Sequence, residues 1–472
     1  MTRALIVAIR ISMVVALLIS STLIGAAQNP VPFLTQPLIP AAMAPRQPAL
    51  VYKLVVNGTG FVPGAAVQWN GEPRTTVFVN SLQLMAFILW SDIFVPTTGW
   101  VTVVNPGPGG GTSNTLFLPV NRPASQLSFE RRDYHVGNMP AFPTAVDLKG
   151  NGILDLAVPI NDNGGGQVLF LLGNGDGTFR NGDTYQVGWG TVKPIFADFN
   201  RDGILDMTLA VHSPGAMAVL LGQGAGTFDL PVFYPIGGAI NWDVTADFNR
   251  DGNLDLATTG VSILLGNGDG TFQPHFDYPA GATTALAVGD FNGDDNLDLV
   301  VANFGAGTAT VLLGNGDGTF RPAVDYPAGA CPGGVAVADL NGDGKLDVVI
   351  ANQCEPSVSV LLGNGDGTFR PQVKYPTSGG AVRVDIADFN DDGKLDIVVA
   401  TGGPFNRNLH GIESNTADVL LGNGDGTFQS PLSFPVAGHA FDVSAYDFNR
   451  DGRADIVTSS YADSSVSVLI QH

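Results

Sequence analysis

Short apolar runs alternate with clusters of glycine and polar residues along most of the chain, and this pattern predicts an all-β fold. Runs such as VAVA, LDVVIA and VSVLL have the length of single strands and are rich in β-branched side chains. The 61 glycines and 31 prolines are spread through the sequence, as turns between many short strands require. After the first 30 residues, no long segment shows the periodicity of a helix.

Residues 126–472 are an internal repeat, marked by the pattern D-x-N-x-D-G-x-x-D. Each repeat unit contains four apolar runs, which we expect to form two hairpins and one four-stranded sheet. Seven such sheets predict a seven-bladed β-propeller. The seven versions of the pattern, here called the first to seventh acidic loops, start at Asp147, Asp198, Asp247, Asp290, Asp339, Asp388 and Asp447.

The two ends of the repeat region are complementary. The seventh unit ends at SVSVLIQH, after its third strand, and lacks the G-T-F strand of the other units. The segment LSFERRDYHVG, residues 127–137, aligns with that missing strand. We therefore expect residues 127–137 to complete the last sheet and close the ring, which removes the free sheet edges of an open array.

The N-terminal residues have the features of a secretory signal peptide. Arg3 and Arg10 precede an apolar run, and Gly25-Ala26-Ala27 is a small-residue cleavage pattern, so residues 1–27 are expected to be removed. An uncleaved membrane anchor is the alternative. Cleavage predicts a secreted or cell-surface protein with no transmembrane segment, and residues 28–36 are expected to be a linker.

Residues 37–122 differ from the repeat and contain several short alternating runs, which predict a small β-sandwich. The segments LVVNGTGFVPGAAVQWNG and VTVVNPGPGGGTSN resemble the IPT/TIG family of immunoglobulin-like domains. The resemblance implies a spacer or a protein-contact module without chemistry of its own.

The acidic loops have the composition of calcium sites. Side chains at positions 1, 3, 5 and 9, with the backbone carbonyl at position 7, offer the dense hard-oxygen ligands that Ca²⁺ prefers. An EF-hand would need a Glu at position 12, where this chain has Val158, Leu209, Thr258, Val301, Ile350, Val399 and Thr458. The first loop departs from the pattern, with Lys149 at position 3, and its occupancy stays open.

The loops and the LLGNGDGTF strands resemble FG-GAP/VCBS repeats, whose relatives form the propeller of integrin α subunits. The resemblance implies about six or seven calcium ions. The implied ligands are Asp147, Asn151, Asp155, Asp198, Asn200, Asp202, Asp206, Asp247, Asn249, Asp251, Asp255, Asp290, Asn292, Asp294, Asp298, Asp339, Asn341, Asp343, Asp347, Asp388, Asn390, Asp392, Asp396, Asp447, Asn449, Asp451 and Asp455.

Loops on the side opposite the acidic loops are the expected ligand-binding surface. Cys331 and Cys354 lie across from each other in the fifth hairpin and are expected to form a disulfide there. Exposed aromatic and polar side chains on loops of a rigid scaffold often mark contact sites. The candidates are Trp189, Trp242, Phe304, Glu355, Phe405, Arg407, His410 and Tyr461.

The net charge of −21 argues against nucleic acid as a partner. The sequence contains no nucleophile elbow, zinc-binding helix or phosphate-binding glycine loop, so no catalytic residue is predicted. The leading hypothesis is a non-enzymatic adhesion or binding module for an extracellular protein or glycan. The alternatives are a secreted polysaccharide- or lipid-active enzyme with dispersed residues in the propeller channel, and a structural spacer of the cell envelope.

Overall fold

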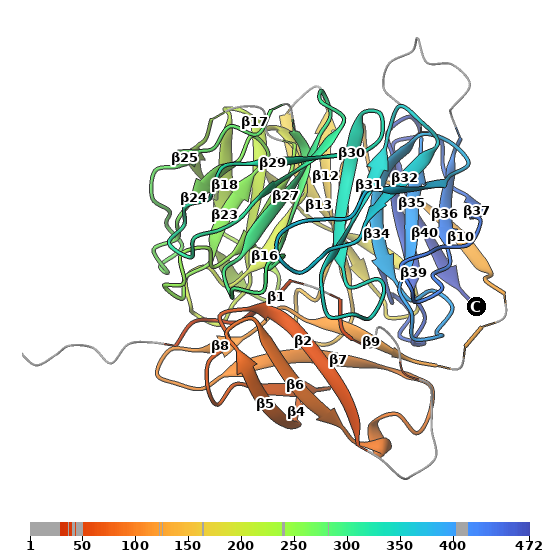
Figure 1. The fold of residues 1–472 in the computed structure, drawn as a ribbon. Coiled ribbons are helices and arrows are strands. Elements are labelled where there is room, and N and C mark those ends of the chain that lie inside the picture. Colours follow the sequence, from red (N-terminus) through yellow and green to blue (C-terminus); the bar gives the residue numbers. More distant parts are fainter. Residues whose placement is uncertain are drawn as a thin grey trace, which may run out of the picture.

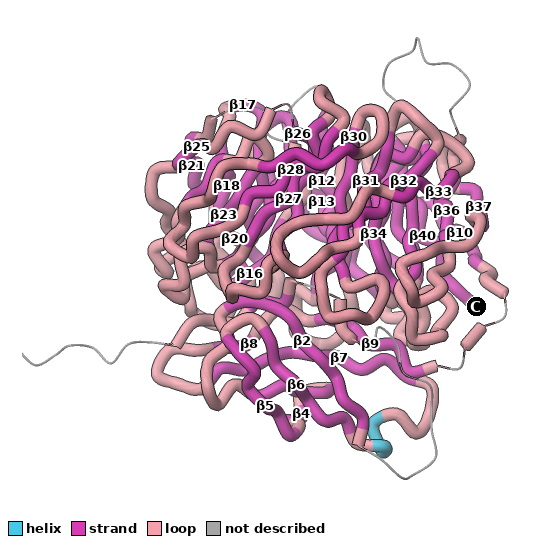
Figure 2. Tube along the Cα trace, viewed as in Figure 1, coloured by secondary structure: helices cyan, strands magenta, loops and turns pink. Residues whose placement is uncertain are grey.

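The computed structural model describes residues 29–35, 37–39, 43, 51–121, 123–124, 126–162, 165–237, 241–281, 283–402 and 414–472. The expected signal peptide lies outside these residues. The described chain is built from strands, with one short 3₁₀ helix, η1 (Trp90–Asp92), drawn in cyan in Figure 2. The predicted all-β fold is confirmed.

Residues 29–121 form two sheets that enclose one core, here called the N-terminal sheets (Figure 1). The first sheet has the order β1 (Phe33–Leu34), β2 (Tyr52–Thr59), β6 (Gln83–Ile88) and β5 (Thr75–Asn80). The second has the order β4 (Glu72–Pro73), β3 (Ala66–Trp69), β7 (Thr97–Asn105) and β8 (Gly111–Thr112), and β9 (Leu116–Val120) also pairs with β7. Alternate side chains of both sheets face the core, including Leu54, Trp69 and Val103.

Part of the segment expected to be a linker belongs to the first of these sheets. β1 pairs with the end of β2, with Phe33 opposite Thr59. The side chain of Asn114 holds it in place: Oδ1 accepts the Leu34 N–H at 2.6 Å, and Nδ2 donates to the Leu34 carbonyl at 3.1 Å. This long-range contact is not visible in the local sequence pattern.

Seven further sheets follow in residues 126–472. The first sheet contains β11 (Thr144–Val146), β12 (Asp155–Asp162), β13 (Gly165–Gly173) and β14 (Phe179–Gln186). In the second sheet, β15 (Trp189–Thr191) and β16 (Ile195–Ala197) both pair with β17 (Asp206–Ser213), which is followed by β18 (Ala216–Leu220) and β21 (Val232–Pro235). The third sheet contains β22 (Asp243–Ala246), β23 (Asp255–Thr258), β24 (Ser262–Leu264) and β25 (Phe276–Asp277), and the fourth contains β26 (Thr283–Gly289), β27 (Asp298–Asn303), β28 (Thr308–Leu312) and β29 (Val324–Pro327).

The fifth sheet contains β30 (Pro332–Ala338), β31 (Asp347–Asn352), β32 (Ser357–Leu361) and β33 (Val373–Pro376). The sixth contains β34 (Ala381–Ala387), β35 (Asp396–Thr401), β36 (Thr416–Leu420) and β37 (Leu432–Pro435). The seventh contains β38 (Ala440–Tyr446), β39 (Asp455–Ser460), β40 (Ser465–Gln471) and β10 (Phe129–His135). A separate two-stranded hairpin, β19 (Gly222–Gly224) and β20 (Thr227–Phe228), follows β18.

The two ends of the repeat region meet in the seventh sheet. β10 pairs antiparallel with β40, from Phe129 opposite Gln471 to His135 opposite Ser465. The seventh loop also contacts the first sheet, because Phe448 packs edge-to-face on Phe179 with ring centroids 5.3 Å apart. The same aromatic contact joins the neighbouring units, as in the pairs Phe199–Phe272, Phe248–Phe320 and Phe291–Phe369.

A buried carboxylate at position 9 ties six of the seven acidic loops to their own sheets through two backbone N–H groups; in the first loop, Asp155 accepts the Gly173 N–H at 2.8 Å. In the second loop, Asp206 is fully buried; Oδ2 accepts the Phe199 N–H at 2.9 Å and Oδ1 accepts the Gly222 N–H at 2.8 Å. The first N–H belongs to loop position 2, and the second lies directly after the third strand of the sheet. Asp255, Asp298, Asp347, Asp396 and Asp455 make the same pair of bonds. We call this contact the position-9 clamp.

The N-terminal sheets lie against the side of the repeat region that carries the acidic loops, here called the loop face (Figure 1). Asn80 Nδ2 donates to Asp295 Oδ1 of the fourth loop at 2.6 Å. The ring of Trp100 covers Gly152 of the first loop, where an added Cβ would lie 1.1 Å from the ring. The opposite face of the repeat region is therefore the one left uncovered by the N-terminal sheets.

The position-9 clamp can be tested by replacing Asp206 with Asn. One amide oxygen replaces two carboxylate oxygens, so one of the two buried N–H groups is left facing an NH₂ group. We expect Asp206→Asn to lower the free energy of unfolding by about 2–3 kcal/mol, measured by denaturant titration in chelator. The control is Asp176→Asn in an exposed turn, where a much smaller change is expected. Equal effects of the two substitutions would contradict the clamp.

Candidate metal centres and the opposite face

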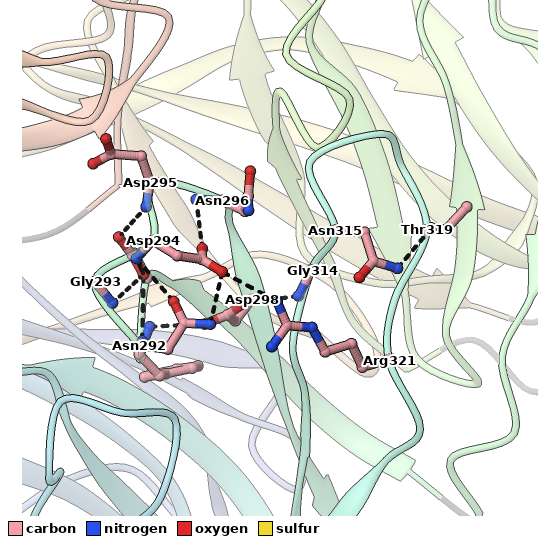
Figure 3. A network of polar contacts seen from close by, with 12 residues as sticks. Asn292, Gly293, Asp294, Asp295, Asn296, Asp298, Gly314, Asn315, Thr319 and Arg321 are labelled. Atoms are coloured by element: carbon pink, nitrogen blue, oxygen red, sulfur yellow. Dashed lines mark hydrogen bonds and ion pairs between the residues drawn. The ribbon is translucent and has the colours of Figure 1, made fainter.

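The carboxylate at position 1 organises each acidic loop through backbone N–H groups. In the fourth loop, Asp290 Oδ2 accepts the Asp295 N–H at 3.0 Å, and Oδ1 accepts the Gly293 N–H at 2.8 Å. Asn292 Oδ1 accepts the Asp294 N–H at 2.9 Å, and Asp294 Oδ1 accepts the Asn296 N–H at 3.0 Å (Figure 3). The side chains of positions 1, 3 and 5 therefore each accept backbone N–H groups of their own loop.

Burial makes these carboxyl groups hard to ionise when no cation is present. Burial raises the pKa of Asp206 and Asp447 to about 6 and that of Asp298 to about 7. It raises the pKa of Asp255 and Asp396 to about 8, and neighbouring loop carboxylates push these values in the same direction. A bound cation would offset both the burial and the repulsion.

Two loops depart from the repeat pattern. In the first loop, Asp147 Oδ2 accepts the Gly152 N–H at 2.6 Å, as in the other loops, although Lys149 replaces the position-3 ligand and Asn151 replaces the position-5 carboxylate with an amide. In the fourth, Asp295 replaces glycine at position 6 and adopts a φ of 65°, a left-handed conformation that Asp tolerates. Both loops keep the turn; only the first loses ligand oxygens.

The residues fit a hard cation in chemistry, since positions 1, 5 and 9 carry carboxylates and position 3 carries an amide oxygen. In the described residues, no three His, Cys, Asp or Glu side chains converge closely enough to hold a metal ion. The carboxylates are instead turned toward backbone N–H groups of their own loops. Because each carboxylate oxygen can accept a second contact, these bonds leave lone pairs for a cation.

The opposite face carries the disulfide and three of the predicted contact residues, Trp189, Phe304 and Glu355. Cys331 and Cys354 are bonded, with Cα atoms 5.3 Å apart. Glu355, next to the disulfide, forms an ion pair with Lys374 at 2.6 Å, and this contact helps to keep the pKa of Glu355 below its usual value although burial opposes it. Trp189 is 49% exposed and lies against His212. Phe405, Arg407 and His410 lie outside the described residues.

A cavity of about 520 Å³ opens between the third and fourth sheets. Its lining residues include Asp277, Asn241, Tyr278 and Phe304, and Phe304 is 38% exposed. Phe304 follows the end of β27, and β27 begins at the fourth acidic loop, so the cavity lies at the strand ends away from the loop face. Of the predicted contact residues that the structure describes, Phe304 is the one that lines this cavity.

A buried cluster of charged and aromatic side chains lies where the first strands of the sheets converge. We call it the axial cluster: Phe142, Lys193, Trp242, Asp243, Arg383, Phe441 and Asp442. The guanidinium of Arg383 lies 5.0 Å from the ring of Phe142 and 5.2 Å from that of Trp242. Lys193 Nζ lies 4.7 Å from Trp242. Tyr461, another predicted contact residue, packs on Phe441.

The axial cluster contains polar atoms without hydrogen-bond partners among the described residues. These are both carboxylate oxygens of Asp243, Oδ2 of Asp442 and Nε of Arg383, and all three side chains are buried. Burial raises the pKa of Asp442 to about 6 and lowers that of Arg383 to about 10. Of this cluster, the sequence pointed to Trp242 alone. The residues five positions before the seven loops are Phe142, Lys193, Trp242, Ala285, Gly334, Arg383 and Asp442, so this position has no shared residue type that could have marked the cluster.

Within the described chain, no helix has the length and apolarity needed to cross a membrane. No curated protein matches the sequence.

The structure is similar to a functionally unknown protein from Desulfotomaculum acetoxidans, with a TM-score of 0.47 and 11% identity over 64% of this chain and 88% of that one. It is also similar to auxiliary nutrient binding proteins from Bacteroides ovatus and Bacteroides thetaiotaomicron. The first has a TM-score of 0.37 and 11% identity over 94% of this chain and 98% of that one. The second has a TM-score of 0.39 and 8% identity over 91% of this chain and 99% of that one.

The family model for the FG-GAP-like repeat matches residues 147–209, 198–258, 247–301, 290–350, 339–399 and 409–458. Every match begins at or before an acidic loop and most run from one loop to the next, so the model describes the same unit as the strands and clamps above. Together the matches cover more than half of the chain, which therefore belongs to the FG-GAP-like repeat family.

Proposed function

We propose that the chain is an exported, calcium-binding β-propeller of seven blades, preceded by an immunoglobulin-like domain, that binds an extracellular protein or glycan. The observation that carries the binding role is the cavity beside Phe304. It combines an aromatic ring with amide, carboxylate and hydroxyl groups, the mixture that recognises polar ligands with an apolar side. The N-terminal sheets lie on the loop face, which leaves this opposite face available to a partner.

The calcium proposal rests on the donor set of the loops and on the burial of their carboxylates. Positions 1, 3, 5 and 9 would hold the ion, together with the carbonyl at position 7, in the six loops that keep the full pattern. Bound calcium would supply the positive charge that offsets the negative charge of the buried carboxylates. The first loop retains Asp147 and Asp155 but would bind more weakly, because Lys149 adds a positive charge.

A secreted enzyme acting on polysaccharide or lipid is the second candidate, and the axial cluster is the observation that favours it. Asp442 and Asp243 are buried acids with unpartnered oxygens, and Asp442 has a pKa of about 6, close to that of a general acid or base. Hydrolysis of polysaccharide or lipid ester that is lost in Asp442→Asn would support this candidate. A ligand that binds without turnover would favour the binding module.

The ligand cavity can be tested by replacing Phe304 with Ala. Truncation removes the ring that lines the cavity while leaving the acidic loops intact, so binding to a hit from a glycan array or an extracellular protein screen should weaken at least about tenfold. Trp189→Ala is the matched control, because Trp189 is an exposed aromatic residue of the same face outside the cavity wall. Equal losses in both variants would remove the cavity from the proposal.

Calcium should raise the thermal stability of the repeat region. Binding to the folded state stabilises it by about 2.7 kcal/mol per site when free calcium is 100 times the Kd. We expect a higher melting temperature in excess calcium than in chelator, measured by scanning calorimetry, and a smaller effect of magnesium at the same concentration. Identical melting in calcium and in chelator would refute the metal proposal.

The stability of the ion-free protein should fall as the pH rises. The folded-state pKa values of Asp206, Asp298 and Asp396 are about 6, 7 and 8, all above the value of an unfolded Asp. The folded state therefore holds extra protons, and their stabilising effect is lost as the pH rises from about 4 to about 8. Calcium binds the ionised form, so the gap between melting temperatures in calcium and in chelator should widen over this range. A constant gap from about pH 5 to about pH 8 would contradict this linkage.

A further inference from the structure

The seventh acidic loop is held by side chains of the N-terminal sheets. The Thr98 hydroxyl of β7 donates to Oδ2 of Asp447, the position-1 carboxylate, and Thr98 is 6% exposed. Asn121 Nδ2 donates to the carbonyl of Asp451 at position 5, at 3.1 Å. Gly452 packs so tightly that an added Cβ would lie 2.5 Å from the Thr97 carbonyl oxygen. Positions 1, 5 and 6 of this loop are thus all in contact with the N-terminal region.

Among the described residues of the other six loops, no side chain of the N-terminal sheets donates to the position-1 carboxylate; Thr59 of β2 reaches the third loop but accepts the Asp247 backbone N–H, at 3.4 Å. Their position-1 carboxylates accept hydrogen bonds from N–H groups of their own loops, as Asp198 does from Asp202 and Gly203. The contact of Asn80 with the fourth loop reaches Asp295, at position 6, whose side chain is not one of the expected ligands. Thr98 therefore contacts the seventh loop at the carboxylate that a bound cation would need.

A second observation at the same junction points to a missing positive charge. Asp391 stands at position 4 of the sixth loop, where the repeat pattern has no acidic residue, and it is 2% exposed. Neither of its carboxylate oxygens has a hydrogen-bond partner in the described part of the chain. The carboxylates of Asp388, Asp447 and Asp451 repel the charge of Asp391, and Arg453 attracts it.

Asp391 lies where the chain leaves the N-terminal sheets. The Ala124 N–H donates to the carbonyl of Asn390, the residue before Asp391, at 2.6 Å. A buried carboxylate without a partner is costly, and three neighbouring carboxylates increase the cost. Release of the N-terminal sheets would expose this junction to water and relieve the cost; a cation bound at the junction would relieve it without release.

We propose that the sixth and seventh acidic loops form a composite interdomain cation site, in which Thr98 positions Asp447 and Asp391 supplies an oxygen outside the repeat motif. Calcium bound there holds the N-terminal sheets against the loop face. This inference rests on the proposed calcium binding, and it adds that one part of that binding is coupled to domain docking. Thr98 is a positioning residue, because it acts through Asp447.

The test measures domain docking and calcium binding separately on the mature chain. Small-angle X-ray scattering reports the radius of gyration during a calcium titration, at a temperature where the repeat region stays folded in chelator. Calorimetric titration counts the bound ions. We expect the wild type to be compact in calcium and more extended in chelator.

Each variant has its own expected result. Thr98→Val should raise the calcium concentration at half-compaction about tenfold, the size of effect typical for residues that orient a metal ligand, and Thr98→Ser should restore it. Asp391→Asn should keep the protein compact even in chelator, because the unpaired charge is gone. Asn80→Ala, which removes an interdomain hydrogen bond away from the ligands, should titrate as the wild type does.

The outcomes separate this inference from the calcium proposal. Calcium binding with the same radius of gyration in calcium and chelator would overturn the composite site and leave the calcium proposal standing. Thr98→Val and Asp391→Asn variants that both titrate as the wild type would overturn it as well. Absence of calcium binding in calorimetry would overturn both proposals together.

Discussion

The repeat region depends on a buried carboxylate that accepts two backbone N–H groups. The position-9 Asp joins loop position 2 to the backbone near the end of the third strand. Hydrogen bonds to a charged group are worth about 1.5–3 kcal/mol each, so six such clamps are a large share of the stability of a domain. The clamp also fixes the loop backbone from which positions 1, 3 and 5 project. Sheet assembly and loop geometry therefore have the same physical origin.

The same carboxylate creates the need for a cation. Full burial raises the pKa of Asp255 and Asp396 to about 8, so near neutral pH an ion-free loop must either hold a proton or bear an unfavourable charge. A divalent cation removes this conflict, because it favours the ionised form that makes the best clamp. Because the pattern is repeated, the cost of burying a charged carboxylate arises separately in each loop. This is the physical reason to expect metal binding in a fold whose strands alone would not require it.

Features that recur in every unit could be predicted from the sequence, whereas features that occur once could not. The apolar runs and the acidic pattern repeat in each unit, so strands, loops and the FG-GAP-like family were recognisable without coordinates. The alignment of residues 127–137 with a missing strand had the same basis, and β10 does lie beside β40. The placement of Arg383 against Phe142 and Trp242 had no such signal, because each unit contributes a different side chain at that position. Thr98 gave no signal either, since its partner Asp447 lies 349 positions away in the sequence.

The residues that occur in only one unit fall into two groups with different expected roles. On the loop face, the unrepeated residues Thr98, Asn121 and Asp391 adapt two of seven similar loops to the N-terminal sheets. On the axis and the opposite face, Arg383 and Phe304 differentiate units whose frameworks are otherwise alike. Repeated units offer equivalent positions, and only departures from the repeat can give one position a distinct chemistry. Partner recognition is therefore expected where the departures are exposed, near Phe304, and internal assembly where they are buried, near Asp391.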